Sequence, residues 1–210
     1  MNITKKRVVL SLGIALAIGG CATTAMRSEG VSDAEVSKVL HESFTSKGQA
    51  TMDRLDQDEV QRACSEAQGK PLAKDVAARL EKSQAATIKY PADGHYLGDW
   101  KNGEKIAQSG VGKQYSDDPK AVAGGNCYAC HQLAKHELAY GTIGPSLYNF
   151  GKIRGYTPEM QRYAFAKVYN SEAFAACSQM PRFGHMGILT EQQIKDVVAL
   201  LMDPKSPVNQ

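Results

Sequence analysis

The segment Cys127-Tyr128-Ala129-Cys130-His131 carries the most specific chemistry in this chain. Two cysteines at this spacing can bond to neighbouring vinyl groups of a haem, and the following histidine can then reach the iron from below the ring. The motif therefore predicts one covalent haem c, with Cys127 and Cys130 as attachment points and His131 as an iron ligand.

Thiol–disulfide exchange and zinc binding are the alternatives for a Cys-x-x-Cys pair. No second pair is present to complete a zinc site, and no strand–helix alternation indicates a thioredoxin-like domain. A signal for export, which covalent haem attachment outside the cytoplasm needs, also favours haem.

That signal covers residues 1–20, where Lys5-Lys6-Arg7 precedes an apolar stretch too short to span a bilayer permanently. The residues up to Cys21 resemble a bacterial lipobox, which predicts lipidation of Cys21 and a membrane tether in the periplasm. Cleavage near residues 23–25, with loss of Cys21, is the alternative. Residues 21–31 have no apolar period and are expected to form a flexible tether.

The charge of the chain excludes nucleic acid as a partner. The formal net charge of +3 comes wholly from the basic residues of the signal, so that the remaining chain has 22 basic and 22 acidic side chains. No basic surface is therefore expected.

Five cysteines in an exported chain each need an explanation, because free thiols tend to pair in an oxidising compartment. With Cys21 and the two haem cysteines assigned, Cys64 and Cys177 remain as a predicted disulfide. Two separately buried thiols are the alternative.

Apolar periodicity predicts an all-α fold, with the haem domain at 91–210 preceded by a helical extension at 32–90. Ser32 and Glu35 have capping-box spacing, and Val36, Val39 and Leu40 follow at helical intervals. A turn at 90–94 marks the boundary. Further helices are expected at 56–68, 72–87, 99–109, 157–171 and 190–202, the last beginning with a capping box at Thr190.

The segment from Gly141 to Leu147 resembles the Gly-Pro-x-Leu loop of class I cytochromes c, which implies that the haem domain at 91–210 is a class I cytochrome c domain. The resemblance implies that the carbonyl of Pro145 accepts a hydrogen bond from His131 and fixes the imidazole tautomer. An ordinary turn proline is the alternative.

The same resemblance implies a sixth iron ligand in the loop before the last helix. Met180 is the candidate, since a thioether ligand favours the ferrous state. Met186 and His185 are the alternatives. His41, His95 and His136 are expected to be solvated or paired locally.

Class I cytochromes also cross their first and last helices at a small residue, which implies that Gly103 faces Val198 and Leu201. Gly103 would otherwise cost its helix about 1 kcal/mol relative to alanine. Four aromatic residues are candidates for the walls of the haem pocket: Trp100, Tyr148, Phe150 and Phe183.

Three segments together resemble SoxX, the small cytochrome family of bacterial thiosulfate oxidation. They are 124–131, 141–147 and the run from Met180-Pro181-Arg182-Phe183-Gly184-His185 into 189–194. The last segment is the most discriminating.

The SoxX resemblance implies a heterodimer with a SoxA-like subunit of one or two haems, forming an L-cysteine S-thiosulfotransferase complex. Thiosulfate is joined oxidatively to a cysteine of the carrier SoxYZ, and this chain accepts the electrons and passes them to a downstream acceptor cytochrome. The catalytic cysteine is expected on the SoxA-like partner, and no catalytic residue is assigned here.

Three other functions are compatible with a single haem motif. A free-standing periplasmic electron shuttle would use the same site without an obligate partner. A gas-binding or sensory haem would have an open sixth position. A peroxidase is less favoured, because such enzymes commonly use a second haem and this sequence has one attachment motif.

Overall fold

The computed structural model describes residues 30–210, so the signal at 1–20, Cys21 and most of the tether lie outside the described residues. Its described secondary structure is helical, which confirms the all-α prediction, and no helix there is long and apolar enough to cross a bilayer. The α-helices are α1 (Asp33–Ser43), α2 (Glu59–Glu66), α3 (Lys74–Ala85), α4 (Trp100–Gln108), α5 (Phe150–Arg154), α6 (Pro158–Tyr169) and α7 (Glu191–Met202). Short 3-10 turns are η1 (Met52–Leu55), η2 (Cys127–Ala129), η3 (Ser171–Ala173) and η4 (Pro207–Asn209).

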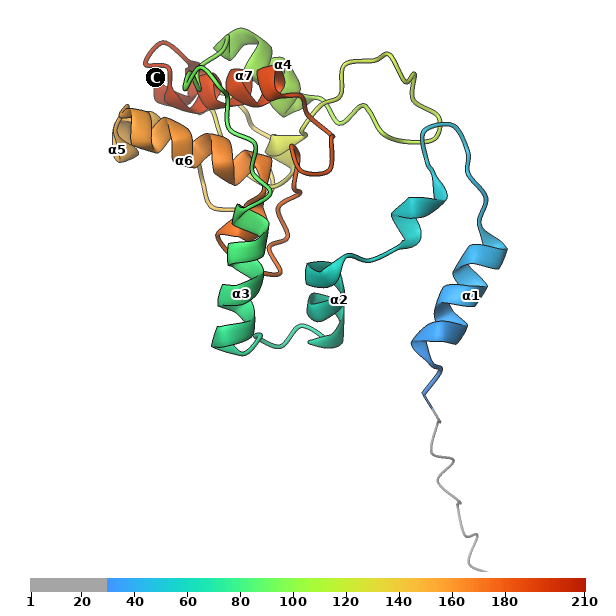
Figure 1. Ribbon diagram of the computed structural model, residues 1–210. Helices are drawn as coiled ribbons and strands as arrows, with labels where there is room; N and C mark the ends of the chain where they lie inside the picture. The colour runs from blue at the N-terminus through green and yellow to red at the C-terminus, as the bar shows by residue number, and fades with distance from the viewer. Residues whose placement is uncertain (1–29) are drawn as a thin grey trace, which may run out of the picture.

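Helix α7 is the centre of the fold, and α4, α5 and α6 all pack against it (Figure 1). It starts at a capping box in which the Thr190 hydroxyl accepts from Gln193 N–H and the Gln193 side chain accepts from Thr190 N–H. Every residue from Ile194 to Met202 is buried. An all-round burial of this kind makes α7 the element on which the rest of the domain is assembled.

Gly103 is the crossing point of α4 over α7. A Cβ at this position would lie 2.1 Å from the Asp196 carbonyl oxygen and 3.0 Å from Leu200 Cβ. The predicted helix crossing at Gly103 is therefore confirmed. The predicted facing residues, Val198 and Leu201, are wrong, because the glycine faces Asp196 and Leu200. Asp196 also accepts the Asp99 N–H through Oδ1 at 2.9 Å, which ties the start of α4 to the same turn of α7.

Gly103→Val is expected to lower the free energy of unfolding by about 3 kcal/mol, the upper end of overpacking costs, because backbone atoms of α7 occupy the space. Denaturant titration of the haem-loaded protein measures this. Asn102→Val, at an exposed neighbouring position of α4, is the matched control. Equal losses in the two variants would contradict the close crossing.

Helices α2 and α3 form the inner part of the extension and contact the domain. Val60 and Leu80 are fully buried, and α3 packs against η3. A disulfide joins Cys64 at the end of α2 to Cys177, with a Cα–Cα distance of 5.5 Å. This part of the extension is consequently continuous with the haem domain.

Helix α1 is different, because it has the expected capping box but no buried residue. The apolar stripe anticipated in this helix does not enter the core: Val36 and Val39 are 46% and 60% exposed. In Figure 1 the helix lies at the far end of the extension from α7.

Candidate haem site

The Cys-x-x-Cys-His segment forms a tight turn against the end of α4. Asn126 enters it in the left-handed conformation (φ 45°), which asparagine tolerates better than most residues. Its N–H donates to Ser109 O at 2.9 Å, and His131 N–H donates to Cys127 O at 2.9 Å. The turn thereby brings both thiols and the imidazole onto one short, fixed stretch of backbone.

The loop 141–147 runs beside this turn and is fastened to it by backbone hydrogen bonds. Gly144 N–H donates to Cys130 O and Leu147 N–H donates to Gln132 O, both at 2.8 Å. A Cβ on Gly141 would lie 1.9 Å from the Ala129 carbonyl oxygen, so only glycine allows this approach.

His131 is held by Pro145, as the resemblance to class I cytochromes c implied. The distance from His131 Nδ1 to the Pro145 carbonyl oxygen is 2.7 Å. Because a carbonyl oxygen only accepts, Nδ1 is the protonated nitrogen, and Nε2 is the one able to bind iron. The two loops together select the tautomer and the orientation of the imidazole.

Gly144→Val is expected to weaken the bond between His131 and iron about 10- to 100-fold, as removal of an orienting contact does. A Cβ at Gly144 would lie 2.1 Å from His131 Cε1 and push the ring away from Pro145. The acid transition in which His131 leaves the iron should then move up by about 1–2 pH units, as measured by absorption. Ile143→Val, at a 75% exposed neighbour, should leave the transition unchanged; an equal shift there would refute the argument.

Cys127 lies in apolar surroundings. A Cβ on Gly125 would be 3.2 Å from Cys127 Sγ and 3.7 Å from atoms of both Phe183 and Leu189. Burial raises the pKa of the free Cys127 thiol to about 12. Exchange sites use thiolates with lowered pKa values, so this environment disfavours thiol–disulfide exchange and suits a sulfur that ends as a thioether.

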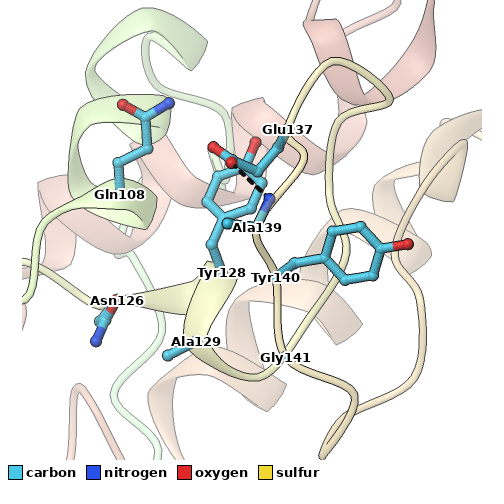
Figure 2. A pocket seen from close by; sticks show the side chains of 8 residues that line it. All are labelled: Gln108, Asn126, Tyr128, Ala129, Glu137, Ala139, Tyr140 and Gly141. Carbon is cyan, nitrogen blue, oxygen red and sulfur yellow. Dashed lines mark hydrogen bonds between the residues drawn. The ribbon is translucent and has the colours of Figure 1, made fainter.

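A cavity of about 350 Å³ lies beside the turn, and Asn126, Tyr128 and Ala129 form part of its wall (Figure 2). Tyr128 and Glu137 line it, and the Ala139 N–H donates to Glu137 Oε1 at 3.1 Å. The cavity wall includes neither motif cysteine nor His131. The three residues predicted to hold the haem therefore lie outside the wall of this cavity.

Met180 lies in the loop between η3 and α7, half-buried and packed against the core. Its carbonyl oxygen accepts a hydrogen bond from Ser171 Oγ at 2.5 Å. Of the two alternatives, Met186 is 53% exposed, and His185 is half-buried beside Arg182 and Asp58. Burial, followed by the nearby Arg182 charge, lowers the pKa of His185.

The aromatic candidates have different surroundings. Phe183 is buried near Cys127, whereas Trp100 and Phe150 pack against the core from its edge. Tyr148 is held at the C-terminus, where its hydroxyl donates to Gln210 O at 2.7 Å. Of the four, Phe183 is the one that the structure places beside a haem-attachment cysteine.

These residues fit a haem c. Two cysteines and a histidine with a defined tautomer lie on one turn, and apolar side chains from the Met180 loop come up to Cys127. A bound haem supplies a one-electron iron centre. Cys127 and Cys130 would hold the ring by their thiols, Pro145 would orient the imidazole, and Phe183 and Leu189 would give the ring an apolar neighbourhood near Cys127.

Comparison with known proteins agrees with this geometry. The sequence model of the cytochrome c family, described as "Cytochrome c", matches residues 112–204. The chain is a cytochrome c domain protein. Such a domain implies covalent haem c and electron transfer.

The match leaves out helix α4, although α4 packs on α7 and belongs to the same folded unit. A protein of Aquifex aeolicus (strain VF5) is 36% identical to this cytochrome c domain protein over 218 residues, covering 98% of this chain and 99% of that protein. It is described as an uncharacterized lipoprotein. The similarity therefore extends through the helical extension as well as the haem domain.

The sequence did not reveal the surroundings of Arg182. This side chain is 5% exposed, and its Nη1 donates to Asp58 Oδ2 at 2.6 Å and to Gln84 Oε1 at 3.2 Å. Asp58 also caps α2. Although partial burial opposes it, the hydrogen bond from Gln61 N–H and the pairing with Arg182 hold the pKa of Asp58 below its usual value.

Proposed function

We propose that this cytochrome c domain protein is the electron-accepting haem subunit of an extracytoplasmic thiosulfate-oxidising complex of the SoxAX type. The observation that supports it best is the segment Met180-Pro181-Arg182-Phe183-Gly184. It combines the candidate sixth ligand with a buried arginine and a phenylalanine beside Cys127. The same segment carries the resemblance to SoxX.

The reaction assigned to the complex joins thiosulfate to a carrier thiol. A sulfur–sulfur bond forms between the terminal sulfur of thiosulfate and the carrier cysteine of SoxYZ, the thiol proton is released, and two electrons leave. A single haem takes one electron at a time, so this chain accepts them in successive steps and passes them to a downstream cytochrome. The sulfur-transferring cysteine belongs to the SoxA-like partner in this proposal.

We propose that His131 and Met180 would be the two protein ligands of the iron, with Cys127 and Cys130 as the covalent attachment points. A thioether ligand would raise the reduction potential, which suits an electron acceptor. The geometry that supports the pair is the Pro145 contact on one side and the half-buried Met180 loop on the other.

Localisation follows from the signal and from the similar Aquifex protein. We propose that Cys21 is the lipidated first residue of the mature chain and tethers it to a membrane in the periplasm. The description of the similar protein as a lipoprotein supports this. Mass spectrometry of the mature N-terminus should find a diacylated Cys21 after removal of residues 1–20; cleavage near residues 23–25 would contradict it.

The complex is tested by purification from the native host with identification of co-eluting proteins. We expect this chain to elute as a stable heterodimer with a sulfur-chemistry subunit. In the presence of that subunit, reduction of the haem should require both thiosulfate and a carrier thiol. A lone monomer whose haem thiosulfate does not reduce, with or without the other subunit and the carrier thiol, would favour a free-standing shuttle.

A further inference from the structure

The segment 170–182, which carries Met180, is held at its start by helix α3 and the residues that follow it. Asn170 is fully buried, and its Nδ2 donates to Gln84 Oε1 and to Thr87 Oγ1, both at 3.0 Å. Since Gln84 is also buried, this is an internal junction, shielded from water.

The middle of the segment is held by both helices of the extension. Ala176 N–H donates to Glu81 Oε1 at 3.1 Å. The next residue, Cys177, is disulfide-bonded to Cys64 of α2 and has a left-handed backbone (φ 64°). A cysteine rarely adopts that conformation, so the surrounding contacts must hold it there.

The end of the segment is held by Arg182. Its guanidinium is enclosed and reaches the Asp58 carboxylate at the start of α2 and the Gln84 amide of α3. A buried arginine requires such partners, because removal of one leaves a charge poorly compensated. Gln84 Oε1 thus accepts from both ends of the segment, from Asn170 and from Arg182.

Met180 lies between the last two attachments, three residues after Cys177 and two before Arg182. So short a stretch has little freedom when both ends are fixed. Inside it, the Met180 carbonyl is held by Ser171 Oγ and its N–H donates to Ser178 Oγ at 3.3 Å. The extension therefore limits where the thioether can lie.

We propose that helices α2 and α3 act as a clamp that positions the Met180 thioether, with the Arg182–Asp58 pair and the Cys64–Cys177 disulfide as its two positioning contacts. This rests on Met180 being the sixth ligand, as proposed above. It assigns the inner part of the extension a role at the haem, namely keeping the sixth position closed.

The test uses the full-length, haem-loaded ferrous protein and the rate of carbon monoxide binding. Asp58→Asn removes the charge that pairs with Arg182 but keeps a good N-cap for α2. Coupling between linked sites typically changes an equilibrium constant about 5- to 150-fold. We expect carbon monoxide to bind Asp58→Asn about tenfold faster than it binds the wild type. The long-wavelength absorption band of methionine on ferric iron should weaken in parallel.

Glu59→Gln is the matched control, because it changes an adjacent carboxylate of α2 that pairs with exposed Arg79 and does not contact the Met180 segment. Exposed pairs of this kind contribute little. Its carbon monoxide rate should equal that of the wild type. Equal rates for Asp58→Asn and Glu59→Gln would overturn the role of the Arg182 pair.

A second measurement uses the wild-type protein, so it does not depend on whether a substituted protein folds. Wild-type protein is treated with a dithiol, which is oxidised to its cyclic disulfide while Cys64 and Cys177 become two thiols. Circular dichroism checks that the helices remain. Faster carbon monoxide binding in the reduced, folded protein supports the clamp, and an unchanged rate overturns the role of the disulfide.

Met180→Ala separates the possible failures. If this variant opens the iron while Asp58→Asn and dithiol treatment do not, the clamp is wrong and the ligand assignment stands. If Met180→Ala also leaves the carbon monoxide rate unchanged, the ligand assignment fails and the clamp fails with it. Neither result bears on whether a SoxA-like partner co-elutes.

Discussion

Met180→Ala is expected to turn a ferrous protein that resists carbon monoxide into one that binds it readily. The half-buried thioether is the proposed sixth ligand, and its removal leaves an open position. The reduction potential should also fall by on the order of 0.1 V, within the about 0.8 V range that axial ligands span. Carbon monoxide titration and potentiometry of the purified haem protein measure the two effects.

Met186→Ala is the control for that experiment. Met186 lies in the same loop but is 53% exposed. It should retain both the resistance to carbon monoxide and the wild-type potential. Should Met186→Ala open the iron and Met180→Ala leave it closed, the ligand would have to be reassigned to Met186.

Replacing Cys127 and Cys130 together by serine is expected to abolish covalent pigment. Serine has no thiol to add to a vinyl group, so haem would be retained only through the imidazole and the apolar contacts. After denaturation and extraction into acidified organic solvent, wild-type protein should keep its haem on the polypeptide. The double variant should keep none.

The control removes the same number of cysteines elsewhere. Cys64→Ser with Cys177→Ser breaks the disulfide but leaves the attachment motif intact. Its pigment should survive extraction, even if the protein unfolds about 2–5 kcal/mol more easily. Free release of haem from the wild type would refute the attachment motif itself.

The sequence predicted most of the helices because their signals are local. Ser32 with Glu35 and Thr190 with Gln193 both form the capping boxes expected of them. Helix α5 was missed, since its five residues are too few to show a period and Asn149 before it is left-handed. The conformation of so short a helix depends on its tertiary contacts. One of them is the hydrogen bond from Gly151 N–H to Asn209 Oδ1 at 3.0 Å.

Tertiary partners were harder to predict than elements. A glycine in a helix indicates a crossing, but the facing residues depend on the rotation of α7, and Asp196 takes the place expected for Val198. The helical spacing of Val36 and Val39 predicted that both are buried, but both are exposed. Helical spacing shows that one face of a helix is apolar, but it does not show which part of the protein packs against that face.

In the candidate site, too, the residues that are close in sequence could be identified, whereas the contacts between distant residues could not. Cys127, Cys130 and His131 lie within five consecutive positions, so a haem role could be proposed for them from their spacing alone. The Arg182–Asp58 contact joins residues separated by 124 positions and has no local signature. An arginine after Met-Pro looks like an ordinary surface residue until the fold places α2 beside it.

The disulfide between Cys64 and Cys177 joins positions 113 residues apart and encloses the haem-attachment turn in its covalent loop. In an unfolded chain the neighbouring pair Cys127 and Cys130 meets far more often, because loop closure becomes less favourable with length. In the oxidising compartment proposed for this chain, the two pairs therefore need opposite treatment. The close pair has to stay reduced if it is to react with a haem, whereas the distant pair has to be oxidised to give the bond that joins α2 to the Met180 segment.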